Sequence, residues 1–512
     1  MRRMLGLGPV FSPGTRWLAA ACALALAAGL ARLADPGLWT DEIYTARWAR
    51  LPWPALFGAL RDSLHPPLFF ALERVAAPLL GGGEAGLRLL SLLAGVGAVA
   101  AAFWAFRPVL HDRVCAAVAW FLVLSPQFLL YARMARYYAL AALIAMLAHG
   151  LFVRLAVRRG RPRSWVLYAV AAAVLLYTSY LPLCLIIAHG VWAAFSRRRR
   201  ELLWPWLGAV GGAFVLFAPW LIVLARGGGA APDLLPPLVA KPTQAVMLLG
   251  FDLHALTASE LLFPWEPAGV LGLLCGIWLL GMGVLAAVRR GLGRSVLLPA
   301  AAALMLSWAS VSSLVSATPF VGLPARTLFL WPFAAAIMAL GALDSAQRRS
   351  LRWTAAIGLA LAWLAGWTHL YRGEHYMNPI YLTPGREVAG DLTREAEPGD
   401  AVLAEEDSGV NYYLEREESR VPVRDPLDPN AVRDLLARPG IRRVWWVRLS
   451  RDGTQRARPA APTEAMLGAW GVPVDSMAYL EIDARYRAIK RVALGVPGYG
   501  HRIVVQRWQR RG

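Results

Sequence analysis

The sequence predicts a polytopic α-helical membrane protein that carries a small α/β domain in its C-terminal part. Of its 512 residues, 57% are hydrophobic, and the mean hydropathy is +0.46. Only 17% are charged, against about 25% in soluble domains. Apolar runs of about 20 residues, the length that crosses a bilayer core, recur from residue 17 to residue 371. This pattern excludes a disordered chain and argues against an ordinary soluble enzyme.

The apolar runs predict about 11 transmembrane helices. The first run, Trp17–Ala34, has no small-residue cleavage site, so we expect a retained span rather than a removed signal peptide. The other spans are expected at residues 85–106, 114–130, 138–157, 164–180, 182–195, 203–225, 267–288, 295–317, 327–343 and 353–371. Residues 1–371 are therefore expected to form the transmembrane domain.

The arginines predict the orientation, because short loops rich in Arg and Lys stay in the cytoplasm. If the spans alternate, every arginine cluster falls on one side of the membrane. The clusters are Arg2, Arg3 and Arg16; Arg107 and Arg113; Arg158, Arg159, Arg161 and Arg163; Arg197–Arg200; Arg289, Arg290 and Arg294; and Arg348, Arg349 and Arg352. We expect a multi-pass protein of a bacterial cytoplasmic (inner) membrane with a cytoplasmic N-terminus. The net charge of +20 is then largely a topology signal, and no nucleic-acid partner is expected.

Two regions are not predicted to be spans. The first outer loop, residues 35–84, mixes Trp and Phe with Arg, which suits short amphipathic helices at the membrane surface. The tail, residues 372–512, is richer in charge and is predicted to be an extracytoplasmic α/β domain. Its helical patterns are at 386–396, 430–437 and 462–470, and its apolar strands are at Ala401–Ala404, Val444–Val447 and Ile503–Val505.

Three candidate catalytic residues lie in the first outer loop. Asp41 and Glu42 directly follow the first span, and neighbours on a helix face different ways. One carboxylate can then serve as a general base or metal ligand while the other holds the loop; the alternative is that the pair only caps a helix. His65 precedes two prolines that restrict the backbone, so it can donate to a phosphate or to a developing charge.

Further candidates are cations on the outer side, where the orientation rule predicts few. Arg88 lies near the outer end of the second span, and Arg326 lies at the mouth of a late one. The stretch from Tyr131 to Leu140 brings Arg133 and Arg136 together with three tyrosines, Tyr137 among them. Each arginine alone could simply snorkel to the interface. Together they suggest a site for an anionic headgroup, because guanidinium binds phosphate in a forked geometry.

One carboxylate base surrounded by cations suits transfer of a group from a phosphate-linked donor. The base would deprotonate an acceptor hydroxyl. The cations would stabilise the charge that grows on the departing phosphate. An amphipathic surface segment would admit a lipid-borne substrate from the bilayer.

The motifs, in this order, resemble those of the polytopic GT-C glycosyltransferases. The likeness is to the protein O-mannosyltransferase and aminoarabinose-transferase group and to bacterial relatives that modify lipopolysaccharide. It rests on these residues: Asp41-Glu42, His65-Pro66-Pro67-Leu68, Arg88-Leu89-Leu90-Ser91, Ser125-Pro126 with the Tyr131 to Leu140 stretch, Pro324-Ala325-Arg326, and the tail segments Pro384–Ala389 and Pro398–Val402.

The resemblance implies a polyprenyl-phosphate-linked sugar as donor and an inverting hexosyl or pentosyl transfer on the outer face. Asp41 would be the base or would organise the site. The arginines and Tyr137 would bind the donor phosphate. The acceptor would be a lipid, a glycan or a protein. Relatives often carry Gln-Glu where this chain has Arg133-Met134, so one acid of the family pattern is absent.

The sequence gives no convincing ligand set for a metal. The four cysteines are widely separated, without metal-ligand or redox spacing. Asp41, Glu42 and His65 are the groups that could meet a divalent metal in space. His149, His189 and His369 lie in apolar runs and are assigned no role.

Two other functions compete with a transferase. A transporter or flippase for a lipid-linked glycan is also polytopic, but ion-coupled carriers usually place ionisable residues inside their spans. Between residues 85 and 225 the acids are Asp112 and Glu201, both in predicted cytoplasmic loops. A membrane receptor that binds a partner through its tail is the other alternative. In that case substitutions in the tail, rather than in the outer loops, would impair function.

Overall fold

The computed structural model of the chain divides into two units. One comprises Met1–Leu33 and Arg47–Arg372, and the other comprises Ala34–Ala46 and Gly373–Gly512. The structure describes residues 13–158, 162–227, 242–302, 304, 323–344, 346, 348–373, 376–377, 379–405, 408–417, 421–426, 429–450, 486–495 and 502–510. The tail unit thus includes a piece of the first outer loop as well as the predicted C-terminal domain.

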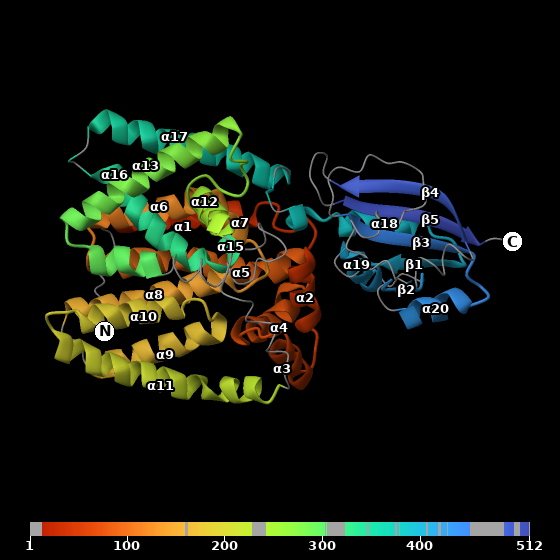
Figure 1. Ribbon diagram of the computed structural model, residues 1–512, viewed down its shortest axis with the longest axis horizontal. Helices are drawn as coiled ribbons and strands as arrows, with labels where there is room; N and C mark the ends of the chain where they lie inside the picture. Colours follow the sequence, from red (N-terminus) through yellow and green to blue (C-terminus); the bar gives the residue numbers. More distant parts are fainter. Residues whose placement is uncertain are drawn as a thin grey trace. The chain divides into compact units, whose positions relative to one another are not determined.

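The first unit is helical, and its long helices run side by side in one bundle (Figure 1). Its helices are α1 (Pro13–Leu30), α3 (Trp53–Asp62), α4 (Leu68–Leu80), α5 (Glu84–Phe106), α6 (Asp112–Leu124), α7 (Pro126–Ala132), α8 (Tyr138–Val157), α9 (Pro162–Thr178), α10 (Leu183–Ala194), α11 (Arg199–Ala225), α12 (Pro242–Thr257), α13 (Pro267–Arg289), α15 (Leu323–Arg326), α16 (Trp331–Leu343) and α17 (Arg349–Arg372). The helix α2 (Thr40–Trp48) has residues in both units.

Five helices of the described part are long and apolar enough to cross a membrane: α1, α5, α8, α11 and α13. The bent pair α6 and α7 would be a sixth. The other described segments that were predicted as spans are also helical, but α10 and α16 are shorter than a bilayer requires. The predicted number of about 11 spans therefore stays a prediction. Most of the predicted span 295–317 lies outside the described residues.

Two details of the helices differ from the sequence prediction. Residues 226–266, which lie between two predicted spans, include the helix α12, whose 16 residues were too few to register as a span. The predicted span 114–130 is broken between α6 and α7 by a bend of 68°. The break follows from Ser125-Pro126: the Ser125 hydroxyl accepts a hydrogen bond from the Phe128 N–H at 3.3 Å, and Pro126 begins the new helix.

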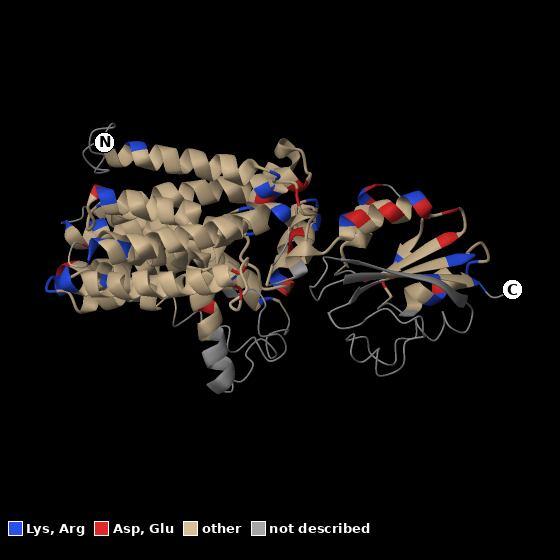
Figure 2. Cartoon of the chain, turned by 90° about the horizontal axis from the view of Figure 1, so that it is seen from above, with Lys and Arg blue, Asp and Glu red and all other residues tan. Residues whose placement is uncertain are grey.

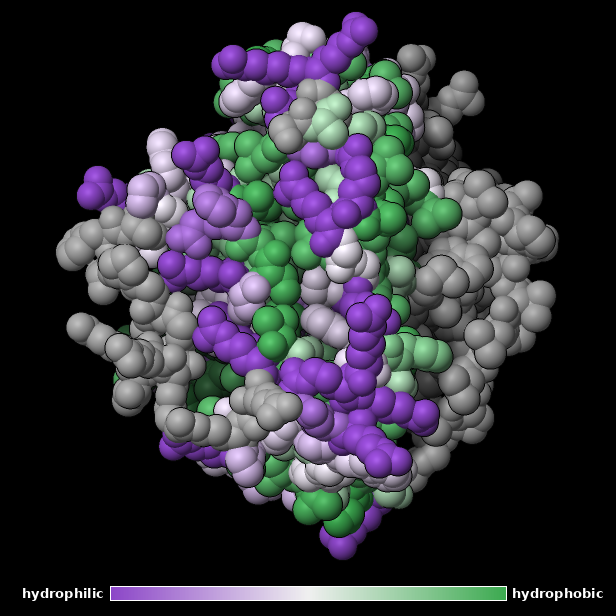
Figure 3. Space-filling view, turned by 90° about the vertical axis from the view of Figure 1, so that its left-hand side faces the viewer, coloured by the Kyte–Doolittle hydropathy of each residue, from purple (hydrophilic) through white to green (hydrophobic). Residues whose placement is uncertain are grey.

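The arginine-rich ends of several helices come together at one end of the helical unit. Arg107 at the end of α5 binds Asp112 at the start of α6 at 3.0 Å. Arg289 and Arg290, which close α13, both pair with Asp344 after α16. Figure 2 shows basic residues gathered at this end, and Figure 3 shows hydrophilic surface there. The predicted alternation of the spans would place these arginines on one side of the membrane.

A hydrogen-bonded chain of polar side chains lies inside the bundle. His149 on α8 bonds His189 on α10 through ring nitrogens 3.1 Å apart. The other ring nitrogen of His189 lies 2.9 Å from the Tyr168 hydroxyl on α9. All three side chains are fully buried. The two histidines therefore bond each other in a core formed by α8, α9 and α10.

The tail unit contains a mixed five-stranded sheet in the order β2-β1-β3-β5-β4. Its strands are β1 (Asp400–Ala404), β2 (Val423–Arg424), β3 (Arg443–Ser450), β4 (Tyr486–Gly495) and β5 (Arg502–Arg510), and its helices are α18 (Gly385–Glu395), α19 (Val410–Arg416) and α20 (Pro429–Ala437). β1 pairs in parallel with β2 and β3, and every residue of β1 is buried. Such a strand is covered on both faces, as in α/β domains. The predicted helix at 462–470 lies outside the described residues.

Small residues let α13 and α16 approach closely. A Cβ built on Gly283 would lie 1.8 Å from the Ile337 carbonyl oxygen, and one on Gly341 would lie 2.2 Å from the Leu279 carbonyl oxygen. Helices pack in membranes through such small-residue contacts. The two glycines therefore make reciprocal backbone contacts between α13 and α16.

We predict that Gly283→Leu destabilises the helical unit by about 1–3 kcal/mol or more, because the new side chain meets backbone that cannot move aside. Gly281→Leu on the same helix is the matched control, since a Cβ there would have no neighbour within 4 Å. Thermal unfolding in detergent, followed by tryptophan fluorescence, measures both. Equal melting temperatures for the two variants would contradict the close contact.

Candidate active site

The candidate site in the helical unit is built around the corner between α7 and α8. All residues from Tyr131 to Leu140 are buried, although the sequence placed residues 131–137 in an outer loop. The helix α7 ends at Ala132, and a turn leads to α8 at Tyr138. Arg133 and Arg136 both lie in this turn, with exposed fractions of 6% and 3%. The chain thus places two guanidinium groups inside the protein, where charges interact more strongly than in water.

Arg136 and His65, two of the predicted site residues, are in direct contact. Nη2 of Arg136 lies 2.9 Å from Nε2 of His65. The guanidinium also lies over the rings of Phe70 and Tyr137, at 5.4 and 5.6 Å from their centroids. The structure therefore brings together three of the predicted residues, His65, Arg136 and Tyr137, on an aromatic support.

This contact defines the protonation of the His65 ring. A guanidinium only donates hydrogen bonds and keeps its proton in proteins, so Nε2 of His65 must be the acceptor. The proton of the neutral ring then sits on Nδ1. Trp48 and Phe70 pack against the ring at centroid distances of 5.6 Å each. His65 thus orients Arg136.

Arg88 and Arg133 meet at the end of α1. Nη1 of Arg88 donates to the Leu33 carbonyl at 3.0 Å. Nη2 of Arg133 donates to the carbonyls of Ala31 and Arg32 at 3.0 and 2.7 Å. These three carbonyls belong to the turn that follows α1. The two arginines hold that turn and are buried there, rather than snorkelling to an interface.

The α7–α8 turn and α5 are also joined by a hydrogen bond. The Ser91 hydroxyl, one turn after Arg88 on α5, donates to the Arg136 carbonyl at 3.0 Å. Ser91 is fully buried. The motif Arg88-Leu89-Leu90-Ser91 therefore has two structural tasks: its arginine binds the end of α1, and its serine fixes the backbone of Arg136.

Asp41 and Glu42 lie in the part of α2 that belongs to the tail unit. Glu42 is fully buried, and its Oε2 accepts from the Trp39 N–H at 3.4 Å. This is the reach-back of an acid at the third helical position to the cap residue. Asp41 is half-buried. Glu42 therefore holds the helix start, and Asp41 stays a candidate for the chemistry.

Within the tail unit, the segment from Ala34 to Ala46 is held by α18 and α19. Arg386 binds Asp35 at 2.9 Å, and the Leu38 N–H donates to the Tyr413 hydroxyl at 2.7 Å. Gly409 has a φ of 71°, and a Cβ there would lie 2.7 Å from Cδ1 of Ile43. A glycine is required at this position by both its backbone conformation and its neighbour. Arg386 belongs to the tail motif noted in the sequence.

Arg326 is an exposed residue at the end of α15. The contacts described above do not include it in the His65–Arg136 group. Among the described residues, no three His, Cys, Asp or Glu side chains come together as a metal site requires.

Comparisons with known proteins identify the fold. Residues 64–223 match the family of dolichyl-phosphate-mannose-protein mannosyltransferases. The crystal structure of ArnT from Cupriavidus metallidurans in the apo state has a TM-score of 0.58 with this chain at 14% identity, covering 97% of this chain and 98% of ArnT. The ArnT structure bound to undecaprenyl phosphate has a TM-score of 0.55 at 14% identity, covering 96% and 98%. No curated protein sequence matches the chain.

The chain has the GT-C glycosyltransferase fold. The resemblance inferred from the motifs is thereby confirmed. The matched family region includes His65, Arg88, Arg133 and Arg136. It excludes Asp41 and Arg326, whose assignment rests on the motif likeness alone.

One buried acid, Glu260, in the turn after α12, was not predicted from the sequence. Its Oε2 accepts from the Tyr131 hydroxyl at 2.6 Å, and its backbone N–H donates to Oε1 of Gln127 at 2.6 Å. The Ser259 hydroxyl donates to the same oxygen at 3.0 Å. Glu260 therefore fixes α7, which carries the arginine turn. The sequence did hold one signal for Glu260: an acidic residue between Ser259 and two leucines.

Burial raises the pKa of Glu260 to about 7, although hydrogen bonds from Tyr131 and Gln127 oppose the shift. Burial likewise raises the pKa of Asp252, on α12, to about 7. Both groups ionise near pH 4 when exposed. The folded protein therefore holds protons on these two carboxyls between about pH 4 and pH 7 that the unfolded chain has already released.

We predict that the free energy of unfolding falls as the pH rises through this window, and that Glu260→Gln flattens part of the fall because an amide does not ionise. Asp252 would account for the remaining slope. Melting temperatures at pH 5 and pH 8 test this, with the exposed Glu395→Gln as control. A Glu260→Gln profile parallel to that of the unmodified protein would contradict the assignment.

Proposed function

We propose that the protein is a membrane glycosyltransferase that moves a sugar from a polyprenyl-phosphate-linked donor to an acceptor hydroxyl. The observation that carries the proposal is the buried Arg136, oriented by His65 in a chain with the GT-C fold. The ArnT structure with undecaprenyl phosphate supports the class of donor. The site would lie on the outer face of a bacterial cytoplasmic membrane, opposite the arginine-rich helix ends.

Arg136 would bind the donor phosphate directly. Its guanidinium is held by one contact to His65 and by two aromatic faces, so it is pre-organised to stabilise a growing negative charge. Arg88 and Arg133 would add positive potential to the donor site. Arg326, which is exposed, would contribute a further positive charge to donor binding.

Asp41 would act as the general base. It would accept the proton of the acceptor hydroxyl as that oxygen attacks the anomeric carbon. The bond between the anomeric carbon and the phosphate oxygen would break, and its electron pair would leave with the polyprenyl phosphate. A single displacement of this kind inverts the anomeric configuration. Glu42 would keep Asp41 in place by fixing the start of α2.

The identity of the acceptor is left as a class: a lipid, a glycan or a protein with a free hydroxyl. The helices α3 and α4 support access from the bilayer. They expose the apolar side chains Trp53, Phe57, Val75 and Leu79, of which Leu79 is 80% exposed. Exposed apolar faces on short helices suit the membrane interface.

A transporter is less favoured by the geometry of residues 85–225. Ion-coupled carriers use acids inside their spans. The two acids between residues 85 and 225, Asp112 and Glu201, lie in the first turns of α6 and α11. Each is paired with an arginine, at 3.0 and 2.7 Å respectively. These acids stabilise helix starts.

We predict that Asp41→Asn abolishes sugar transfer but retains the donor lipid, because an amide cannot take the acceptor proton. Mass spectrometry of the envelope lipids and glycans of a deletion strain, complemented with each variant, measures transfer. Retention of undecaprenyl phosphate by the purified protein measures binding. Asp62→Asn is the control, since Asp62 is exposed and pairs with Arg61. Normal sugar transfer by the Asp41→Asn variant would exclude Asp41 as the general base.

We predict that Arg136→Gln lowers kcat/KM by about 10²–10³, the usual cost of removing one donor to a developing anion. His65→Ala should lower it less, and His65→Gln should recover part of the loss because its amide oxygen can accept from Arg136. Adding His65→Ala to Arg136→Gln should cost little more, since the two residues act as a unit. If the losses of the two single variants simply add in the double variant, the pairing of His65 and Arg136 is contradicted. Arg113→Gln is the control, because Arg113 is exposed at the arginine-rich end of the helical unit.

A further inference from the structure

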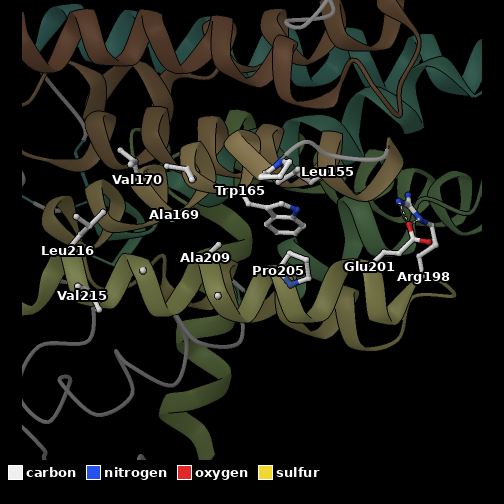
Figure 4. A pocket seen from close by; sticks show the side chains of 14 residues that line it. Leu155, Trp165, Ala169, Val170, Arg198, Glu201, Pro205, Ala209, Val215 and Leu216 are labelled. Atoms are coloured by element: carbon white, nitrogen blue, oxygen red, sulfur yellow. Dashed lines mark hydrogen bonds and ion pairs between the residues drawn. The ribbon is translucent and has the colours of Figure 1, made fainter.

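A groove of about 970 Å³ lies between α9 and α11, away from the candidate active site. Its lining is largely apolar and includes Trp165 and Ala169 on α9 and Gly208 and Gly212 on α11. Figure 4 shows the salt-bridged Arg198 and Glu201 at one end of the groove and Val215 and Leu216 at the other. Ligand sites are usually about 300–1,000 Å³, so the groove has the size of a ligand site.

The groove opens on a surface that is apolar enough to face lipid. Val166 and Val215, which line it from opposite helices, are 62% and 73% exposed. The helix α11 is one of the helices long and apolar enough to cross a membrane. A hydrocarbon chain lying along the groove would cover these side chains and fill the space left by the two glycines.

The polar end of the groove is strongly basic. Residues 151–202 contain nine arginines and a single acid, Glu201. Glu201 binds Arg198 at 2.7 Å, and Nη1 of Arg198 donates to the Ala156 carbonyl at 3.3 Å. This joins the end of α8 to the start of α11. The arginines beside the lining residues are exposed: Arg158, Arg163, Arg197, Arg199 and Arg200.

We propose that this groove binds an anionic phospholipid of the leaflet on the arginine-rich side. Its acyl chains would lie between α9 and α11, and its headgroup phosphate would meet the exposed arginines beside Arg198. Basic pockets between transmembrane helices on the cytoplasmic side bind anionic headgroups. The Arg198–Glu201 pair is neutral, so the surplus charge at the mouth comes from the surrounding arginines. One phospholipid matches both parts of the groove: its acyl chains fit the apolar lining, and its phosphate fits the basic end.

The proposal is tested by native mass spectrometry of the full-length protein in detergent with phosphatidylglycerol, phosphatidylcholine or undecaprenyl phosphate added. Phosphatidylglycerol should be retained in preference to phosphatidylcholine. Replacing Arg197, Arg199 and Arg200 together with Gln should lower its retention by about tenfold or more. Equal retention of the two phospholipids, or no loss in the triple variant, would overturn the proposal.

A second pair of variants tests the groove itself. Gly208→Phe would fill it without a clash, because a Cβ at Gly208 has no neighbour within 4 Å. Gly211→Phe is the matched control: a Cβ at Gly211 has equally open surroundings, and Gly211 does not line the groove. Phosphatidylglycerol retention should fall at least about tenfold in the first variant only. Equal retention by both variants, or displacement of phosphatidylglycerol by undecaprenyl phosphate, would contradict the assignment.

Discussion

The helical unit depends on keeping a guanidinium charge buried at the corner between α7 and α8. An isolated charge in such a place is costly, and it is tolerated only with hydrogen bonds and nearby polarisable groups. Arg136 has the Nε2 of His65 at 2.9 Å and two aromatic faces. Around it, α5 fixes the backbone through Ser91. The break at Ser125-Pro126, the short α7 and the buried turn all serve to place this cation.

The general architecture could be predicted from the sequence, because the sequence patterns that indicate it are local. Apolar runs of membrane length and their flanking arginines predicted most helices of the first unit, and apolar strands predicted β1, β3 and β5. The candidate site residues could be predicted, because arginines on the outer side depart from the rule that basic residues stay on the cytoplasmic side. His65, Arg136 and Tyr137, more than 70 positions apart at the extremes, do come together.

What could not be predicted depends on contacts between distant segments. Nothing local to Arg88 or Arg133 indicates that they bind the carbonyls of the turn just after the first helix. Glu260 reaches Tyr131 across 129 positions, and its importance is visible only when its burial is known. The grouping of residues 34–46 with the tail unit follows from Arg386, Tyr413 and Gly409, which no periodicity links to the first outer loop. That Glu42 binds the start of its own helix likewise required the position of the Trp39 N–H.

The most direct measurement is an experimental structure of the full chain with undecaprenyl phosphate bound, obtained by electron cryo-microscopy. The account predicts that the phosphate lies within hydrogen-bonding distance of the Arg136 guanidinium, with Nδ1 of His65 facing it. A phosphate bound elsewhere, with the Arg136–His65 contact facing only protein, would contradict the account.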